Sequence, residues 1–316
     1  MTMHTMTRRE LMALSAPILA PWLPASAGRL LAAAHSAAAS ARAASALSFC
    51  LFSKHLPELN WSDLGRAVKG AGFDGVDLTV RPQGHVAPER AADDLPRAVE
   101  AIAAHGITVP MITTELTSAA APTARPILQA AAKSGVRYFK TGYWRYAPSG
   151  SGPDVRAQVA ATGEALAGLA ALAREFNIEL GFHNHAAYIG AALWDIAPSI
   201  DRLDPRSAGY YFDPRHAVAE GGAGAWKAAT ELVAPRLKML AVKDCYWSKS
   251  PKGWVVENCP LGDGMVDWSA VASIVRAARF TGPISVHLEY TIPPGTANTL
   301  AAARRDLDVA KKHFDW

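Results

Sequence analysis

The sequence predicts a single-domain α/β fold, a (β/α)8 or TIM barrel, over residues 47–316. Apolar, β-rich runs alternate with Ala- and Leu-rich helical runs, and this alternation indicates parallel βα units. Eight such units fit at roughly 33 residues each, which favours a closed barrel over an open sheet. No Gly-x-Gly-x-x-Gly follows the first strand, which disfavours a dinucleotide-binding sheet.

Short apolar runs predict the eight strands. We expect them at 47–53, 75–80, 107–113, 136–141, 178–185, 208–212, 237–243 and 284–289. Asn60 or Ser62 is a suitable cap for the first helix, and Gly106 and Gly135 fit the ends of the second and third. We expect helices at 61–71, 88–105, 123–134, 154–176, 193–203, 225–234, 268–278 and 299–313, and a long loop with room for a hairpin at 244–267.

The first 46 residues differ from the rest of the chain. Arg8 and Arg9 precede an apolar stretch that runs to Pro24, and Ala-Ser-Ala at 25–27 is a suitable cleavage site. This pattern predicts a twin-arginine signal peptide at 1–27, an Ala-rich linker at 28–46 and an exported, periplasmic protein. The apolar stretch is too short and too rich in proline for a good membrane span, so we expect no membrane association after cleavage.

Charge and cysteine content exclude some classes of protein. The net charge is +4 without a dense Lys/Arg run, so nucleic-acid binding is not suggested. The three cysteines are Cys50, Cys245 and Cys259, and none belongs to a Cys-x-x-Cys pair. A disulfide framework is therefore not expected, although a single Cys245–Cys259 bridge stays open.

Polar residues follow most of the predicted strands, where a TIM barrel carries its active site. His183 and His185 end the fifth strand, and residues two apart in a strand point to the same face. Two imidazoles at this position indicate a metal site or an acid/base site. The strongest candidates for metal ligands are His183, Asp213 and Glu289, from the fifth, sixth and eighth strands. Imidazole nitrogen and carboxylate oxygen suit a divalent metal ion.

Several segments together resemble the xylose isomerase-like barrel superfamily of sugar isomerases, sugar 3-epimerases, inosose dehydratases and AP endonucleases, which includes the sugar phosphate isomerase/epimerase family. They are residues 75–82 with 84–86, Gly-Phe-His-Asn-His at 181–185, Phe-Asp-Pro-Arg-His at 212–216, Lys-Asp at 243–244, residues 260–268 and His-Leu-Glu at 287–289. The resemblance covers most of residues 47–313.

The resemblance implies one divalent metal ion (Mn, Co, Mg or Zn) held by an acidic residue, an Asp, a His and a Glu from strands five to eight. Asp213 and Glu289 match this pattern. His183 stands where many members carry Glu, and Ala241 stands where the seventh strand often carries His. Either His185 or Glu115 completes the coordination sphere, or the metal is weakly bound or absent.

The resemblance further implies a metal-dependent isomerase or epimerase that moves a proton next to the carbonyl of a sugar through an enediolate. Glu289 is one candidate base, and His183 is the second if it is not a ligand. Lys243 and Lys140 are candidates for holding an oxyanion or a hydroxyl, and an ordinary salt bridge between Lys243 and Asp213 is an equal alternative.

The expected substrate is a carbohydrate, because aromatic rings that stack on sugars follow two strands. The candidate substrate-binding residues are His216, Arg215, His85, Glu115, Tyr143, Trp144, Trp247 and Trp254. Two other functions stay open: a lyase or hydratase that cleaves a keto-glycoside by β-elimination, and a sugar-binding barrel without catalysis. An AP endonuclease would need more metal ligands and a basic DNA face. A homo-oligomer is left open.

Overall fold

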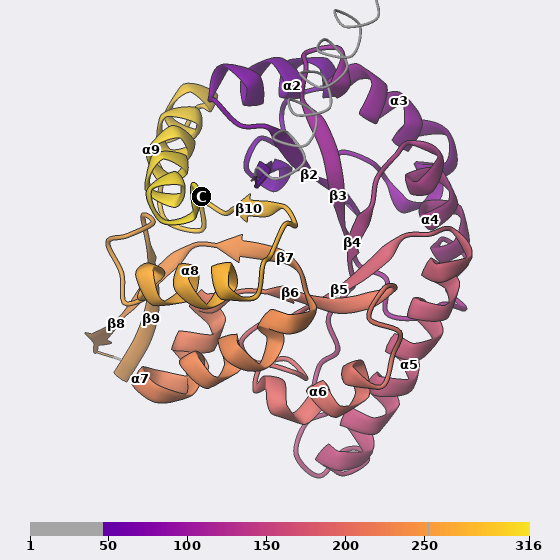
Figure 1. Ribbon diagram of the computed structural model, residues 1–316, viewed down its shortest axis with the longest axis vertical. Coiled ribbons are helices and arrows are strands. Elements are labelled where there is room, and N and C mark those ends of the chain that lie inside the picture. Colours follow the sequence, from indigo (N-terminus) through magenta and orange to yellow (C-terminus); the bar gives the residue numbers. More distant parts are fainter. Residues whose placement is uncertain (1–46, 252) are drawn as a thin grey trace, which may run out of the picture. The chain divides into compact units, whose positions relative to one another are not determined.

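Eight parallel strands close into a barrel in a computed structural model that describes residues 47–251 and 253–316 (Figure 1). Around the barrel the strands follow the order β1, β10, β7, β6, β5, β4, β3, β2. They are β1 (Phe49–Phe52), β2 (Gly75–Val80), β3 (Thr108–Thr114), β4 (Tyr138–Lys140), β5 (Glu179–His183), β6 (Ala208–Phe212), β7 (Leu237–Val242) and β10 (Ile284–Val286). The predicted TIM barrel is confirmed, whereas the predicted signal and linker lie outside the described residues.

Eight α-helices of the described chain surround the barrel (Figure 1). They are α2 (Trp61–Gly70), α3 (Ala91–Ala103), α4 (Ala124–Lys133), α5 (Val155–Glu175), α6 (Leu193–Asp201), α7 (Pro214–Val233), α8 (Trp268–Ala277) and α9 (Thr296–Phe314). Three short 3-10 helices are η1 (Ser53–His55), η2 (Pro88–Arg90) and η3 (Ala234–Arg236). Apolar side chains between the strands and the helices form the main core. Of the described helices, none has the length and apolar character needed to cross a membrane.

Helix α7 begins at Pro214, so the prediction that it begins at residue 225 was wrong. Asp213 is its N-cap and accepts a hydrogen bond from the His216 N–H, and Pro214 occupies the first turn, where a missing N–H costs nothing. Gly222 interrupts the helix with φ 58° and ψ −157°, and the glycine-rich stretch hid its first half from the sequence analysis. The correction matters because Arg215 and His216 lie in this first turn.

The predicted hairpin after the seventh strand is confirmed. β8 (Asp244–Ser250) pairs antiparallel with β9 (Gly253–Cys259), outside the barrel. Cys245 and Cys259 lie near the base of this hairpin, and both are buried free thiols. The Cys245–Cys259 bridge that the sequence left open is therefore not formed here.

The interior of the barrel contains a second, smaller apolar cluster formed by Met111, Tyr138, Tyr211, Met239 and Ala241. Ala241 is fully buried in this cluster and contributes no polar atom to any site. Because side chains two apart on a strand share a face, Lys243 projects on the same side as Ala241, one layer closer to the C-terminal ends of the strands.

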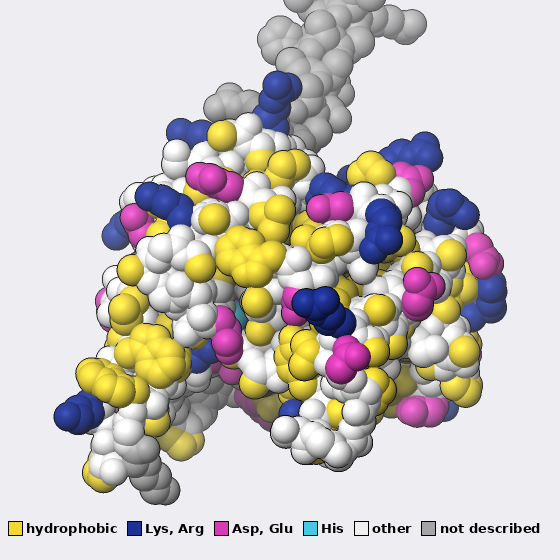
Figure 2. Space-filling model, turned by 90° about the horizontal axis from the view of Figure 1, so that it is seen from below, with side chains coloured by type: hydrophobic (Ala, Val, Ile, Leu, Met, Phe, Trp, Pro, Cys, Tyr) yellow, Lys and Arg dark blue, Asp and Glu magenta, His cyan; other side chains and the backbone are white. Residues whose placement is uncertain are grey.

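The outer surface carries charges of both signs. On the face shown in Figure 2, Lys and Arg side chains alternate with Asp and Glu side chains, and single hydrophobic groups lie between them. This face has no continuous basic area of the kind that a nucleic-acid backbone requires.

Candidate active site

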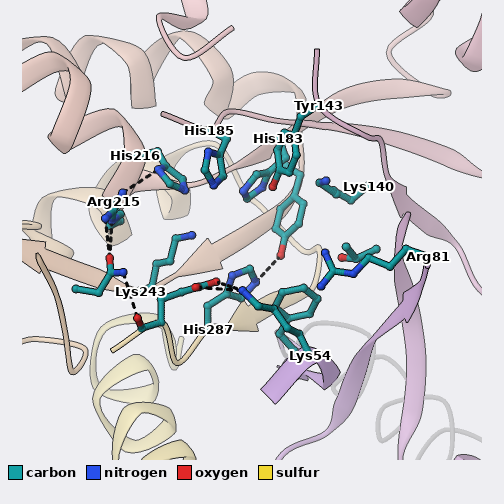
Figure 3. Close-up of a pocket in the computed structure, with 15 residues that line it drawn as sticks. Lys54, Arg81, Lys140, Tyr143, His183, His185, Arg215, His216, Lys243 and His287 are labelled. Carbon is teal, nitrogen blue, oxygen red and sulfur yellow. Dashed lines mark hydrogen bonds and ion pairs between the residues drawn. The ribbon is translucent and has the colours of Figure 1, made fainter. Parts of the chain in front are cut away.

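A polar cavity of ≈ 260 Å³ lies at the C-terminal ends of the barrel strands (Figure 3). Eight of the predicted site residues line it: Lys140, Tyr143, His183, His185, Arg215, His216, Lys243 and Glu289. Seven further residues complete the lining: Phe52, Lys54, Arg81, Thr113, Tyr211, Asn258 and His287. Its position is the one at which TIM-barrel enzymes carry their active sites.

Strand β5 ends at His183, two residues earlier than predicted, yet both histidines reach the cavity (Figure 3). Their ring centroids are 6.4 Å apart. The Asn184 side chain is fully buried and bonds the backbone of Asp213 twice, since its Nδ2 donates to the Asp213 carbonyl at 3.0 Å and its Oδ1 accepts from the Asp213 N–H at 2.8 Å. Asn184 therefore fixes the position of Asp213 against β5.

Asp213 is fully buried at the start of α7 and collects three groups around its Oδ2. His183 Nε2 lies 3.6 Å away, His216 Nε2 3.7 Å away and Lys243 Nζ 3.1 Å away. The ligand atoms of His183, Asp213 and His216 all lie within 4.8 Å of one another, close enough to suit one metal ion. This grouping differs from the predicted ligand set, because it includes His216 and leaves out His185 and Glu289.

One feature of this cluster favours a metal ion, and two oppose it. Asp213 Oδ2 and His216 Nε2 have no hydrogen-bond partner among the described residues, as expected of free ligand atoms. However, the Lys243 ammonium already forms an ion pair with Oδ2. Arg215 Nη1 also lies 3.0 Å from His216 Nδ1. A guanidinium only donates hydrogen bonds, so Nδ1 accepts, and the proton of the neutral imidazole sits on Nε2, the atom that faces Asp213.

The charges around Asp213 determine whether a divalent metal ion can bind there. Burial holds the pKa of His183 and His216 well below the ordinary value, so both rings are neutral. The Lys243 ammonium, 3.1 Å from Oδ2, supplies positive charge at the place where a divalent ion would sit, and like charges repel strongly in a buried site. As placed, these residues would hold a divalent metal ion only after Lys243 had moved away.

Glu289 lies a few residues beyond β10 and forms an ion pair with Lys54 at 3.1 Å, away from Asp213. Burial alone would raise the pKa of Glu289, but the charges of Lys243, Lys54 and His55 outweigh it and lower the pKa to about 2. The Glu289 side chain is therefore a carboxylate at neutral pH and faces the cavity as a potential base.

His185 presents a second base to the same cavity. Its Nδ1 lies 2.9 Å from the carbonyl oxygen of Ala186, which can only accept, so Nδ1 carries the proton and Nε2 has a free lone pair. Burial lowers the pKa of His185, which keeps the ring neutral. Its ring centroid lies 3.9 Å from that of His216 and 4.9 Å from that of Tyr143.

A hydrogen-bonded network forms the floor of the cavity. Asp77 accepts hydrogen bonds from Thr113 Oγ1 at 2.7 Å, Ser285 Oγ at 2.9 Å and the Tyr211 hydroxyl at 3.2 Å. The same hydroxyl lies 3.0 Å from His287 Nε2. Burial raises the pKa of Asp77 to about 6 in spite of these bonds. The network joins four strands beneath the cavity and holds the His287 ring in place.

Six predicted site residues do not line the cavity: Asp213, which is fully buried, and five others. His85 contacts Thr79 Oγ1 and the Leu56 carbonyl oxygen, both at 3.2 Å. Glu115 lines a separate cavity, and Trp144 stacks on Phe182 at 6.3 Å between centroids. Trp247 and Trp254 lie on the β8–β9 hairpin with 41% and 67% of their surface exposed.

Lys54, Arg81 and Asn258 line the cavity but are not among the predicted site residues. Arg81 is one of the polar residues that follow the second predicted strand, although no role was predicted for it, and Lys54 directly follows the first predicted strand, so the strand-end rule could have identified it too. Asn258 carries no such signal, because it reaches the site from the hairpin. Its Oδ1 accepts from Arg215 Nε at 3.0 Å and Nη2 at 2.6 Å, and its Nδ2 donates to the Glu289 carbonyl at 3.1 Å. Asn258 thereby ties α7 to the segment after β10.

Fold and site together define a TIM-barrel protein with a polar cavity, rich in histidine and lysine, at its catalytic face. A family model described as xylose isomerase-like TIM barrel matches residues 66–313, and the chain belongs to this family. No match to a curated protein was found.

Solved structures with the same fold include several sugar epimerases. The chain is similar to D-psicose 3-epimerase, solved in the presence of D-fructose, with 15% identity and a TM-score of 0.63 over 85% of this chain and 100% of that one. It is also similar to 3-keto-D-glucoside 4-epimerase YcjR from E. coli, in its apo form, with 16% identity and a TM-score of 0.65 over 84% of this chain and 99% of that one. The IOLI protein with a bound zinc atom shows 15% identity and a TM-score of 0.65 over 85% of this chain and 100% of that one. At these identities the likeness shows the fold.

Proposed function

We propose that this protein is a sugar isomerase or epimerase that moves a proton on the carbon next to a carbonyl, through an enediolate. One observation carries the proposal: the Glu289 carboxylate and the free Nε2 of neutral His185 face one small cavity together with the Lys243 ammonium. The sugar epimerases among the structures of the same fold support it.

Proton transfer needs a base that is unprotonated at working pH and an acid that returns the proton. Glu289 meets the first requirement, although the cations that lower its pKa to about 2 also make it a weak base. His185 can take or return a proton at Nε2, since its Nδ1–H is held by the Ala186 carbonyl. An epimerase would use the two on opposite faces of the carbon, and an isomerase would use one of them twice.

The enediolate needs positive charge beside its oxygen atoms, because preorganised charge lowers the barrier most in a site that excludes water. Lys243 is buried and its Nζ is held by Asp213 at 3.1 Å. We propose that Lys243 supplies this charge, in place of the metal ion that the sequence pattern implied. Asp213 then acts as the positioning residue for Lys243.

Incubation with a panel of ketoses, aldoses, uronates and 3-keto-glycosides, followed by NMR and mass spectrometry of the products, tests the reaction class. We expect a rearranged sugar of unchanged mass, and a loss of about 10²- to 10⁴-fold in Glu289→Gln. Glu164→Gln, an exposed site on α5, is the matched control and should keep full activity. Release of an aglycone or of water would replace this proposal with the lyase reaction.

We also propose that residues 1–27 direct export through the twin-arginine route and that the mature barrel works in the periplasm. Replacing both Arg8 and Arg9 by Lys should retain the protein in the cytoplasm of a host with this export system. Cell fractionation and immunoblotting measure the location. An unchanged periplasmic fraction in the double variant would contradict the proposal.

A further inference from the structure

The cavity holds more positive charge than the proposed reaction uses. Five basic side chains line it: Lys54, Arg81, Lys140, Arg215 and Lys243. Two of them have a carboxylate partner, since Lys54 pairs with Glu289 and Lys243 pairs with Asp213. The histidines that also line the cavity add no negative charge, because an imidazole is either neutral or cationic.

The other three cations form no ion pair with a carboxylate of the described chain. Arg215 has other partners, since it donates to Asn258 and to His216. Arg81 and Lys140 each contact an aromatic ring: Arg81 Cζ lies 5.8 Å from the Phe52 centroid and Lys140 Nζ lies 3.4 Å from the Tyr143 centroid. Lys140 is only 3% exposed.

Arg81 and Lys140 lie on the same side of the cavity (Figure 3). After burial, the charge of Arg81 is the largest cause that lowers the pKa of Lys140, and Asp77 and Glu115 act in the opposite direction. Charging the buried Lys140 beside the half-buried Arg81 is costly while neither has a carboxylate in an ion pair among the described residues. Such an arrangement is stabilised when a ligand brings the missing negative charge, and both side chains can hydrogen-bond a carboxylate or a phosphate.

We propose that the substrate of this cavity carries an anionic group, a carboxylate or a phosphate, that binds between Arg81 and Lys140. The proposal rests on the proposed function in one respect, that the substrate is a sugar. It narrows the substrate class to acidic sugars, such as hexuronates or sugar phosphates, and assigns Arg81 and Lys140 to recognition of the anion rather than to proton transfer.

Isothermal titration calorimetry with matched sugars tests this binding without requiring turnover. The probes are D-glucuronate and D-galacturonate, D-glucose and D-galactose, and the 6-phosphates of the two hexoses. We expect at least one acidic sugar to bind tenfold or more tightly than its neutral counterpart. Preference for the uronates identifies a carboxylate, and preference for the 6-phosphates identifies a phosphate.

Three variants test whether Arg81 and Lys140 cause the preference for the acidic sugar. Lys140→Met and Arg81→Met should each remove about tenfold or more of the affinity for the acidic sugar, whereas Lys133→Met, at an exposed position on α4, should leave it unchanged. If Lys140→Met fails to fold, the affinity of Arg81→Met for the acidic sugar and the salt dependence of binding to the wild type test the anion site instead. Raising the salt concentration should weaken binding of the acidic sugar and leave that of the neutral sugar unchanged.

Equal affinities within every matched pair, no binding of any acidic sugar at millimolar concentration, or a preference that survives both substitutions would overturn the proposal. These outcomes differ from a failure of the proposed function. Tight binding of an acidic sugar without rearrangement would refute the isomerase or epimerase reaction and support the anion site. Turnover of neutral sugars without a preference for acidic ones would support the reaction and refute the anion site.

Discussion

Lys243 occupies the position beside the buried Asp213 carboxylate that a divalent metal ion would otherwise take. With the ammonium 3.1 Å from Oδ2, a divalent ion would have to displace it. We predict that Lys243→Met binds Mn²⁺ or Zn²⁺ at least tenfold more tightly than the wild type, because it frees Oδ2 and removes a repelling charge. Titration calorimetry on chelator-treated protein measures this. Lys133→Met is the control for loss of a lysine, and equal affinity in wild type and Lys243→Met would contradict the assignment.

Lys140 couples folding stability to pH. Burial first, and then Arg81, lower its pKa in the folded protein to about 7, well below that of an unfolded lysine. Between these two values the unfolded chain binds a proton that the folded protein does not, so this lysine makes stability rise as the pH rises above 7. Below pH 7 Lys140 is protonated in both the folded and the unfolded protein, so its contribution to the free energy of unfolding no longer changes with pH.

Urea unfolding at pH 7, 8 and 9 measures this contribution. We expect the free energy of unfolding of the wild type to gain about 2 kcal/mol over this range relative to Lys140→Met, which lacks the titrating group. The comparison with the variant removes the effect of the other groups that titrate in this range. Parallel curves for the two proteins would show that Lys140 has an ordinary pKa.

At the scale of elements, the site depends on how α7 joins β5 and β6. Asn184 bonds both backbone groups of Asp213, and Asp213 caps α7, so one amide aligns a strand end, the carboxylate and the first turn of the helix. We predict that Asn184→Ala lowers the free energy of unfolding by about 2 kcal/mol, because it leaves the buried Asp213 N–H unpaired and removes one of two hydrogen bonds to the Asp213 carbonyl, which keeps that from Ala217.

The same substitution should lower activity more than stability loss explains, because Asp213 would no longer hold Lys243 in place. Urea unfolding and the rate of product formation, both measured at a temperature where Asn184→Ala is fully folded, separate the two effects. Full activity in the folded variant would show that Asn184 is a structural residue alone.

The sequence predicted elements better than side-chain partners. Alternating apolar and helical runs were sufficient for the eight strands, because burial on both faces leaves a strong local signal. The start of α7 was missed although Asp213 and Pro214 are ordinary helix-start signals. The salt bridge between Lys243 and Asp213, one of the two roles considered for Lys243, is present in the structure. The role of Asn258 and the lack of a carboxylate partner for Arg81 among the described residues depend on contacts between distant segments, which no local pattern encodes.

At the scale of the whole molecule, close packing between neighbouring strands of the barrel limits which side chains fit. A Cβ on Gly209 of β6 would lie only 2.1 Å from the backbone oxygen of Arg236, which cannot move independently. We predict that Gly209→Ala lowers the free energy of unfolding by about 2 kcal/mol through overpacking. Gly224→Ala on α7 meets nothing within 4 Å and should be neutral or slightly stabilising.

Urea unfolding of both glycine variants measures the difference. A Gly209→Ala protein as stable as Gly224→Ala would mean that the strands can separate locally.

We propose that Glu289, His185 and Lys243 move a proton in this cavity without a resident metal ion. Deuterium incorporation from D₂O next to the carbonyl of a bound sugar, followed by NMR, tests it most directly. Protein treated with a chelator and shown metal-free by elemental analysis should still exchange, and Glu289→Gln should not. Exchange that disappears on chelation and returns only with Mn²⁺, Co²⁺ or Zn²⁺ would contradict the claim.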